Sequence, residues 1–440
     1  MQYLIICLNI VHNRFYFLLM ITSLKKHISP IIQQHAEESA ILHNIRLRQV
    51  IAPHVKLHHL RRIDDRIAAH LDGLAVAGSY GSDVCKAALE NAGAGEVFAA
   101  AVCAIEQKDV QWLDKLFALT NAASEVQAGL ISAFGWVSAQ HLEGIGIDLL
   151  SSQDLLKQQM GLEACVWHRV NPGASLAALI MHHEPQLRSR ALRATGELGR
   201  IDLRFLCEHA MTDKDVDCRF WAAWSAVLLG NRTSAVEMLK TFSATINSFQ
   251  ELALRLALKV MALNEVHTFL KTLAQNPSNM RCLIQGAGIC GDPYFVAWLI
   301  KQMEDPKLAR LAGESFSFIT GLDLAYLDLE RDAPENAEMK PDDDPKDEDV
   351  QMDEDDNLLW PDPIKIQSWW EINQVNFVPG QRYFMGKPVV HEQLVQILKQ
   401  GYQRQRIAAA QYLCLLEPGS QLFPTSAPAW RQQRWLANIN

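Results

Sequence analysis

The residues best suited to metal chemistry lie near the start of the chain. His54 and His58 are four residues apart, so on a helix both imidazoles share one side, a spacing that can bind a transition metal. The glutamate of an H-E-x-x-H motif is absent, and the spacing gives no third ligand. Arginines alternate with Asp64 and Asp65 just beyond, a pattern typical of ion pairs on an exposed helix. The sequence therefore predicts no metal site.

Recurrent arginines could bind phosphate or could hold repeats together. Arg188, Arg219 and Arg281 open similar phrases of the sequence, with acids nearby. In stacked helical repeats such an arginine can pair with an acid of the next unit and fix the register, with a gain of roughly 0.5–1 kcal/mol per exposed pair. We favour this structural role over a phosphate-binding ladder.

A basic cluster at 188–204 supports an alternative function, the binding or modification of nucleic acid. Some DNA-repair glycosylases use a HEAT-like array with a basic, aromatic-lined face. Here Trp221 and Trp224 follow the cluster, but they lie in an alanine-rich stripe that is more typical of a core. Base flipping would also need an exposed carboxylate aimed into a groove, and the sequence nominates none.

No other motif indicates catalysis or a cofactor. There is no G-x-S-x-G, no P-loop and no G-x-G-x-x-G that opens a helix after a strand. The glycines of 286–291 approach the last pattern inside a helical stretch, where close helix packing explains them. The nine cysteines are never spaced as C-x-x-C, so they indicate small buried residues in a reducing, cytoplasmic environment. We expect a protein without catalytic residues or cofactors, and not an enzyme.

Length and charge limit the classes of protein that fit. At 440 residues the chain exceeds one ordinary core, so it forms several domains or a repeat array. Apolar residues make up 49% and charged residues 21%, as in folded proteins, and no uninterrupted apolar run is long enough to predict a membrane-spanning helix. The net charge of −9 disfavours non-specific binding of nucleic acid.

The acidic residues are concentrated in one segment. Between Glu330 and Asp356 there are 14 acidic and three basic residues, a balance of −11 that leaves +2 for the rest of the chain. Such a composition predicts a disordered acidic linker over 330–357. The opposite signs also suggest a second hypothesis, an arm that folds over a basic groove and blocks it.

A recurrence of about 31 residues organises the middle of the chain. Residues 188–199 and 219–230 share an opening Arg, an Ala three residues later and a closing Leu-Gly or Leu-x-Gly, and steps of similar length reach Gln250, Arg281 and Arg310. Cap or turn signals precede the helical runs; they are Glu184-Pro185, Asn276-Pro277, Asp292-Pro293 and Asp305-Pro306. The sequence predicts an all-α fold, an α-solenoid of HEAT-like helical hairpins.

The domain limits follow from changes in composition. Residues 1–19 are apolar but lack a signal-peptide pattern, and Met20 is a plausible start, so we expect a start-site artefact or a disordered extension. A helical N-terminal cap is predicted over 20–94 and the repeat array over 95–329. After the acidic linker, 358–440 should hold an irregular aromatic segment and one more helical repeat. Within it, 375–377 and 382–384 could pair as a short hairpin.

The units over 188–230 resemble HEAT-like repeats of the phycobilisome-lyase type. From about residue 37 the chain resembles an uncharacterised proteobacterial family of HEAT-repeat proteins, through segments such as Ala312-Gly-Glu-Ser-Phe-Ser-Phe-Ile, Trp369-Trp370 and Gly401-Tyr-Gln-Arg-Gln-Arg. The resemblance implies an association with type VI secretion or its effectors. It implies no catalytic residue.

The function we expect is that of a non-enzymatic scaffold or adaptor that binds another protein. A stack of helix pairs offers an extended concave surface and few deep pockets. The partner would be a secretion component or an effector, and neutralisation of a toxin is a special case. If exposed, the aromatic residues would be contact residues, and otherwise they only seal the array. The candidate contact residues are Trp369, Trp370, Tyr383, Phe384, Arg190, Arg193 and Arg204.

Overall fold

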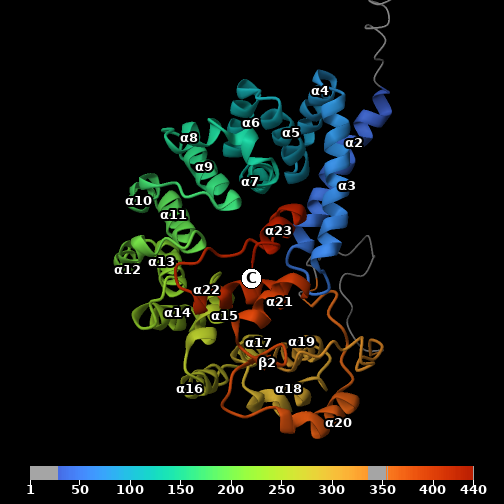
Figure 1. Cartoon of the computed structure of the whole chain (residues 1–440), viewed down its shortest axis with the longest axis vertical. Coiled ribbons are helices and arrows are strands. Elements are labelled where there is room, and N and C mark those ends of the chain that lie inside the picture. Colours follow the sequence, from blue (N-terminus) through green and yellow to red (C-terminus); the bar gives the residue numbers. More distant parts are fainter. Residues whose placement is uncertain (1–27, 335–352, 354, 440) are drawn as a thin grey trace, which may run out of the picture. The chain divides into compact units, whose positions relative to one another are not determined.

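The computed structural model describes residues 28–334, 353 and 355–439 (Figure 1). Residues 1–19, and most of the acidic segment (335–352 and 354), lie outside the described residues. Within the described part the secondary structure is helical apart from one two-stranded hairpin and two isolated bridges, which confirms the all-α class. The chain divides into two compact units, residues 1–46 with 63–142 (unit 1) and 47–62 with 143–440 (unit 2).

Unit 1 is built around one almost wholly buried helix, α5. Its elements are α2 (Ser29–Gln49) and α3 (Leu57–Val76), which both cross the unit boundary, then α4 (Ser79–Ala88), η1 (Leu89–Asn91), α5 (Ala94–Glu106), α6 (Val110–Ala122), η2 (Ser124–Val126), α7 (Gln127–Trp136) and η3 (Ala139–Leu142). Two glycines bring backbones together: a Cβ on Gly95 would meet the Ala40 carbonyl, and one on Gly129 would meet that of Ala94. Arg46 and Asp64 form a buried ion pair between α2 and α3.

Unit 2 contains most of the helices. They are α8 (Ile145–Leu150), α9 (Leu155–His168), α10 (Ala174–Ile180), α11 (Pro185–Glu197), η4 (Ile201–Leu203), α12 (Arg204–Ala210), α13 (Val216–Leu228), α14 (Ser234–Ala244), α15 (Gln250–Val260), α16 (Leu263–Leu273), η5 (Pro277–Asn279), α17 (Met280–Cys290), η6 (Pro293–Phe295), α18 (Val296–Gln302), α19 (Ala309–Thr320), α20 (Pro363–Asn373), η7 (Gln374–Asn376), α21 (His391–Gln400), α22 (Gln403–Leu416) and α23 (Ala429–Leu436). The strands are β1 (Tyr383–Phe384) and β2 (Lys387–Pro388).

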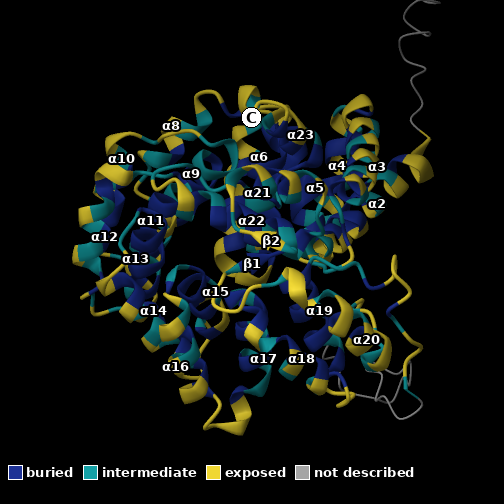
Figure 2. Ribbon diagram, turned by 60° about the horizontal axis from the view of Figure 1, so that its bottom comes forward, coloured by how far each residue is buried: buried dark blue, intermediate teal, exposed yellow. Residues whose placement is uncertain are grey.

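Alternate helices of unit 2 form two rows. In the inner row α9, α11, α13, α15, α17 and α19 each pack on the next, and the outer-row helices α10, α12, α14, α16 and α18 each pack on the inner helix that follows. The segments that carry the 31-residue recurrence are α11, α13, α15, α17 and α19, all in the inner row. Figure 2 shows that α13 and α15 are largely buried, as expected for helices packed on several sides.

The turn signals at Asn276, Asp292 and Asp305 act through their side chains, whereas Glu184 makes no side-chain bond to the start of α11, and Pro185 opens that helix. The side chains of Asn276, Asp292 and Asp305 each accept a hydrogen bond from the backbone N–H two residues further on, at 2.9–3.0 Å. Asp215 accepts one from the N–H of Cys218 and caps α13. Each interaction satisfies a backbone donor that a helix start or turn would leave unpaired.

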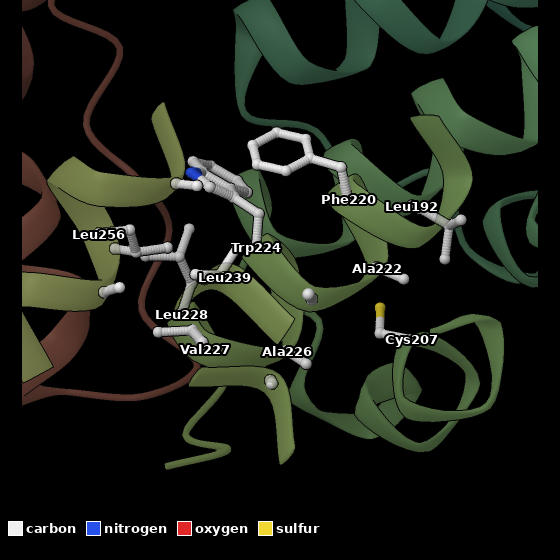
Figure 3. Packing of buried hydrophobic residues seen from close by; sticks show 14 of the residues in the cluster. Leu192, Cys207, Phe220, Ala222, Trp224, Ala226, Val227, Leu228, Leu239 and Leu256 are labelled. Atoms are coloured by element: carbon white, nitrogen blue, oxygen red, sulfur yellow. The ribbon is translucent and has the colours of Figure 1, made fainter. Parts of the chain in front are cut away.

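One hydrophobic cluster of unit 2 runs from α9 to α17, and Figure 3 shows part of it around α13. Phe220 is stacked on Phe249 with ring centroids 4.1 Å apart, and Trp224 is buried beside them. Trp224 therefore lies in the core as predicted, and Trp221 is packed against it. Gly196 has no room for a Cβ because Ser225 lies against it, which draws α11 and α13 together.

The short hairpin differs from the predicted one. Residues 374–376 form a 3-10 turn, and Tyr383 and Phe384 pair instead with Pro388 and Lys387. Met385 and Gly386 both have positive φ, which matches the tight two-residue turns that join antiparallel strands. The predicted pairing of 375–377 with 382–384 is wrong because Tyr383 donates its N–H to Gly291 of α17 instead.

Residues 382–422, here the return segment, run back along the inner row and touch the glycines that end its helices. A Cβ on Gly291 would lie 2.0 Å from the Tyr383 carbonyl oxygen, and one on Gly321 would lie 2.5 Å from Met385. The other two contacts are Gly199 with Gly419 and Gly230 with Pro418. Backbone hydrogen bonds also join the return segment to the inner row. The Tyr383 N–H donates to the Gly291 carbonyl at 2.8 Å, and the Met385 N–H donates to the Phe318 carbonyl at 2.7 Å. The chain's own return segment thus covers these ends of the inner row.

None of the helices in the described ranges combines the length and the apolar character that crossing a membrane requires.

We predict that Gly291→Ala destabilises unit 2 more than Gly380→Ala does. Both residues have positive φ (+71° and +82°), so an alanine at either costs about 1–2 kcal/mol of backbone strain. Only the Cβ at 291 also collides with the return segment, whereas nothing lies within 4 Å of one at 380. Urea unfolding of the two variants measures the difference, and equal losses would refute the importance of this contact.

Candidate functional site

A cavity of about 430 Å³ in unit 2 is lined by several charged side chains. Its walls come from α15, α17, α19 and α22, with Ile51, Asp355 and Phe384 added from elsewhere in the unit. The charged and polar residues of the lining are Glu251, Arg255, Lys259, Arg281, Gln285, Glu314, Ser315, Asp355, Arg404, Gln411 and Tyr412. A stack of helix pairs was expected to have few deep pockets; this cavity forms where α22 of the return segment packs on α15.

Lys259 is the most unusual group in this lining. It stands in α15 and is 8% exposed. Its Nζ donates to the Arg255 carbonyl at 3.0 Å and to the Gln411 side-chain oxygen at 2.7 Å, and it lies 5.5 Å from the centre of the Tyr412 ring. Burial, together with the charges of Arg255 and Arg382, lowers the pKa of Lys259 to about 7. Both of its hydrogen-bond acceptors are neutral.

The three arginines of the lining each have a carboxylate partner. Arg255 pairs with Glu251, Arg281 pairs with Asp355 at 2.7 Å, and Arg404 pairs with Glu314 at 2.9 Å. Burial raises the pKa of Glu314, and the charge of Arg404 opposes that rise only in part. The arginines and carboxylates therefore balance one another around the cavity.

Arg382 adds positive charge near Lys259. Its guanidinium donates to the carbonyls of Leu258 and Met261 at 2.5 and 2.7 Å, where α15 ends. A cation suits the negative end of a helix dipole. Its charge also acts on Tyr412: burial raises the pKa of that phenol, and Arg382 opposes the rise.

The recurrent arginines bind either a carboxylate or backbone carbonyls. Arg188 pairs with Asp213 of the next repeat at 2.7 Å, as the register-fixing role predicts, whereas Arg219 donates to the backbone carbonyls of Asp213 and Lys214. Arg281 and Arg310, further along the row, take carboxylates from the end of the acidic segment.

That end of the acidic segment is held firmly. Asp355 is buried and receives two bonds from Arg281, while Asp353 pairs with Arg310 at 2.5 Å. Arg310 also donates to the Asp355 backbone carbonyl. Because Asp355 lines the cavity, the acidic segment forms part of the site. The hypothesis of a blocking arm depends on 335–352, which lie outside the described residues.

The four aromatic candidates for protein contact belong to the core. Trp370, Tyr383 and Phe384 are 8%, 5% and 2% exposed, and Trp369 is half-buried against Phe316. Their rings pack on one another and on the inner row because this segment closes the end of the array. From the sequence, exposed aromatic residues are expected to be contact residues and buried ones only to seal the fold. Since these residues are buried or half-buried, they take the sealing role.

Arg190 is a structural residue in a buried ionic network. It binds Glu163 and Glu197, at 2.5 and 2.9 Å. Burial acts against the charge of Arg190, but the two carboxylates outweigh it and raise its pKa. Burial likewise opposes ionisation of Glu197, yet Arg190 and Arg193 lower its pKa. Arg190 and Glu197 therefore favour each other's charged forms.

The other two arginines are accessible but paired. Arg193 binds Glu197 at 2.8 Å and lies 4.6 Å from the centre of the Trp221 ring, and Arg204 lies 3.3 Å from Glu208. The structure therefore does not bring Arg190, Arg193 and Arg204 together as one exposed basic surface.

The histidines near the start of unit 2 do not form a metal centre with their neighbours. The rings of His58 and His59 are 4.0 Å apart, and His59 accepts a bond from the Lys56 N–H. Across the described ranges no three potential ligands converge on one point.

Comparisons of the chain with protein-family models, with curated proteins and with solved structures find no match.

Sequence reasoning missed the Lys259 site. The only signal available was a lysine within the apolar run Leu254-Arg-Leu-Ala-Leu-Lys-Val-Met, on the apolar face of the predicted helix. Gln411 and Tyr412, which complete its surroundings, are about 150 residues away, and no local pattern relates them to it.

We predict that Arg190→Met lowers the free energy of unfolding by about 3–5 kcal/mol, because it leaves Glu163 and Glu197 buried without their shared cation. Arg204→Met is the control: it breaks an exposed pair within one helix and should cost about 0.5 kcal/mol or less. Urea unfolding at neutral pH compares the two. Similar small losses would show that the network contributes little.

We further predict a pH-dependent cost of burying Lys259. Between about pH 7 and 10.5 the folded protein holds this proton less well than the unfolded chain, so stability rises with pH there, by at most about 1.4 kcal/mol per pH unit. Lys259→Met should be more stable than the unaltered protein below pH 7, and this advantage should shrink towards pH 10.5. Unfolding measured across this range tests it, with exposed Lys271→Met as control. A difference that does not vary with pH would contradict the prediction.

Proposed function

We propose that this protein is a HEAT-like helical-repeat protein that binds another protein and catalyses no reaction. Two observations support the repeat architecture: the recurrence of about 31 residues, and the two rows of helices in which each inner helix packs on the next. Stacks of helix pairs of this kind commonly serve as binding surfaces. A scaffold or adaptor fits this description, with a secretion component or an effector as the class of partner.

The inner row is not the surface that we assign to the partner. The return segment occupies it, with backbone bonds to α11, α17 and α19. A partner would have to displace Tyr383, Met385 and Leu422 from those carbonyls. The contact surface must therefore lie elsewhere in the unit.

The single observation that carries the proposal is an exposed aliphatic ridge on α20 and η7. Ile364, Ile372 and Val375 are 78%, 75% and 82% exposed; Ile364 lies about two turns before Ile372 in α20, and Val375 lies in η7, just past the end of that helix. The opposite side carries Ile366 and Trp370 into the core. Exposed aliphatic side chains on one element can be buried by a partner, and this surface is the one that we assign to the partner.

The charges beside the ridge define its partner. Asp328, Asp362 and Glu371 stand near it with one base, Lys365, which pairs with Asp328 at 3.1 Å. A partner helix with apolar side chains on one face and lysines or arginines beside them would bury the ridge and meet these carboxylates. Such a helix is the occupant that we propose.

The ion pairs of the 188–204 cluster do not favour the alternative function, nucleic-acid binding. Each arginine of the 188–204 cluster has a carboxylate partner, so the cluster offers little net charge to a phosphate backbone. Toxin neutralisation is a special case of protein binding and would use the same ridge.

We predict that Ile372→Glu with Val375→Glu abolishes partner binding. Affinity purification identifies the partner, and titration with the purified partner then gives its affinity. Loss of two aliphatic contacts from the centre of the ridge should weaken binding at least 30-fold, equivalent to about 2 kcal/mol.

The matched control is Val216→Glu with Ile246→Glu, which places the same added charge on exposed aliphatic positions away from α20. This variant should bind as the unaltered protein does. If both double variants keep the partner, the ridge is not the interface. Salt-dependent binding of duplex DNA without any protein partner would overturn the proposed function itself.

A further inference from the structure

Lys259 is a buried amine without a carboxylate partner among the described residues. Among the described residues its Nζ has no ion pair, although its two neutral acceptors hold it in place. Arg255 and Arg382 add positive charge from α15 and from the start of the return segment. Because burying a charged ammonium without a counter-ion costs several kcal/mol, the empty site favours the neutral amine, and an anion beside it would favour the charged form.

The remaining charged groups around the cavity cannot supply the missing anion. Glu251 is committed to Arg255, Asp355 to Arg281 of α17 and Glu314 of α19 to Arg404 of α22. Glu251 also accepts a bond from Gln285 at 3.0 Å. An anion that enters the cavity therefore meets one cation whose charge is not already balanced.

Part of the cavity wall is apolar. Phe318 and Leu311 come from α19, Ile289 from α17, Ile407 and Ala408 from α22, and Phe384 from β1. These side chains offer an aliphatic or aromatic body a dry surface, while Lys259 and Gln411 lie on the polar part of the wall. A concave site that combines apolar side chains with placed polar groups is the usual form of a ligand pocket.

We propose that this cavity binds a small organic carboxylate, with the carboxylate on the Lys259 ammonium and an apolar body against Phe318, Phe384 and Ile407. The volume of about 430 Å³ suits a molecule the size of a medium-chain acid. The site lies in unit 2 apart from the proposed protein contacts on α20, and it does not depend on them. Because β1 and α22 form two of its walls, the bound acid would also hold the return segment in place.

Octanoate is a suitable probe and 1-octanol is its uncharged match. Calorimetric titration of the full chain at pH 8 should show that octanoate binds more tightly than octanol by at least about tenfold. Octanoate should also draw close to one proton onto the protein, because the amine, with a pKa of about 7, must become charged. Titrations in HEPES and in Tris, whose ionisation enthalpies differ, measure that proton uptake.

Lys259→Met and Lys259→Gln should each lose the preference for octanoate over octanol and take up no proton. The glutamine variant keeps a polar group that can reach Gln411, so a shared loss isolates the charge. Exposed Lys271→Met is the control and should behave as the unaltered protein. Absence of octanoate binding, equal affinity for octanol, or binding by both Lys259 variants with proton uptake intact would each overturn the proposal.

Discussion

The close approach of the return segment to the ends of the inner-row helices is the contact on which the rest of unit 2 depends. Gly199, Gly291 and Gly321 combine positive φ with backbone neighbours so near that no side chain fits. Each lies just after a helix of the row, where the last carbonyls lack partners within the helix. The return segment supplies N–H groups to several carbonyls in this region, including those of Gly291, Phe318, Ile319 and Glu197. The carbonyls at the ends of these helices are therefore also the acceptors that hold the return segment in place.

This contact also creates the site. Without α22 across α15, Lys259 would face water and keep an ordinary pKa; with it, Gln411 and Tyr412 enclose the amine. The two arginines at the end of the row then hold Asp353 and Asp355, so the acidic segment is fixed to the rim at its C-terminal end. The two rows of helices, the return segment and the cavity are parts of one packing arrangement.

The sequence predicted what local periodicity determines and missed what distant contacts determine. The helices at Arg188, Arg219, Gln250, Arg281 and Arg310 follow from spacing, caps and proline signals, and they lie where expected. The aromatic segment could not be placed in the same way, because burial of Trp370 and Tyr383 depends on the row that they close. The Leu-Gly phrase was visible as a repeat, but its role, making room for the backbone of the return segment, depends on residues up to about 220 positions away in the chain.

Native-state hydrogen exchange tests the central claim most directly, through the amides of Tyr383, Met385, Gly386 and Leu422. These N–H groups donate to the carbonyls of Gly291, Phe318, Ile319 and Glu197, so they should be protected nearly as well as the amides in the middle of α13 and α15. Exchange at the rate of exposed loops, with α13 and α15 still protected, would show that the return segment does not rest on the inner row.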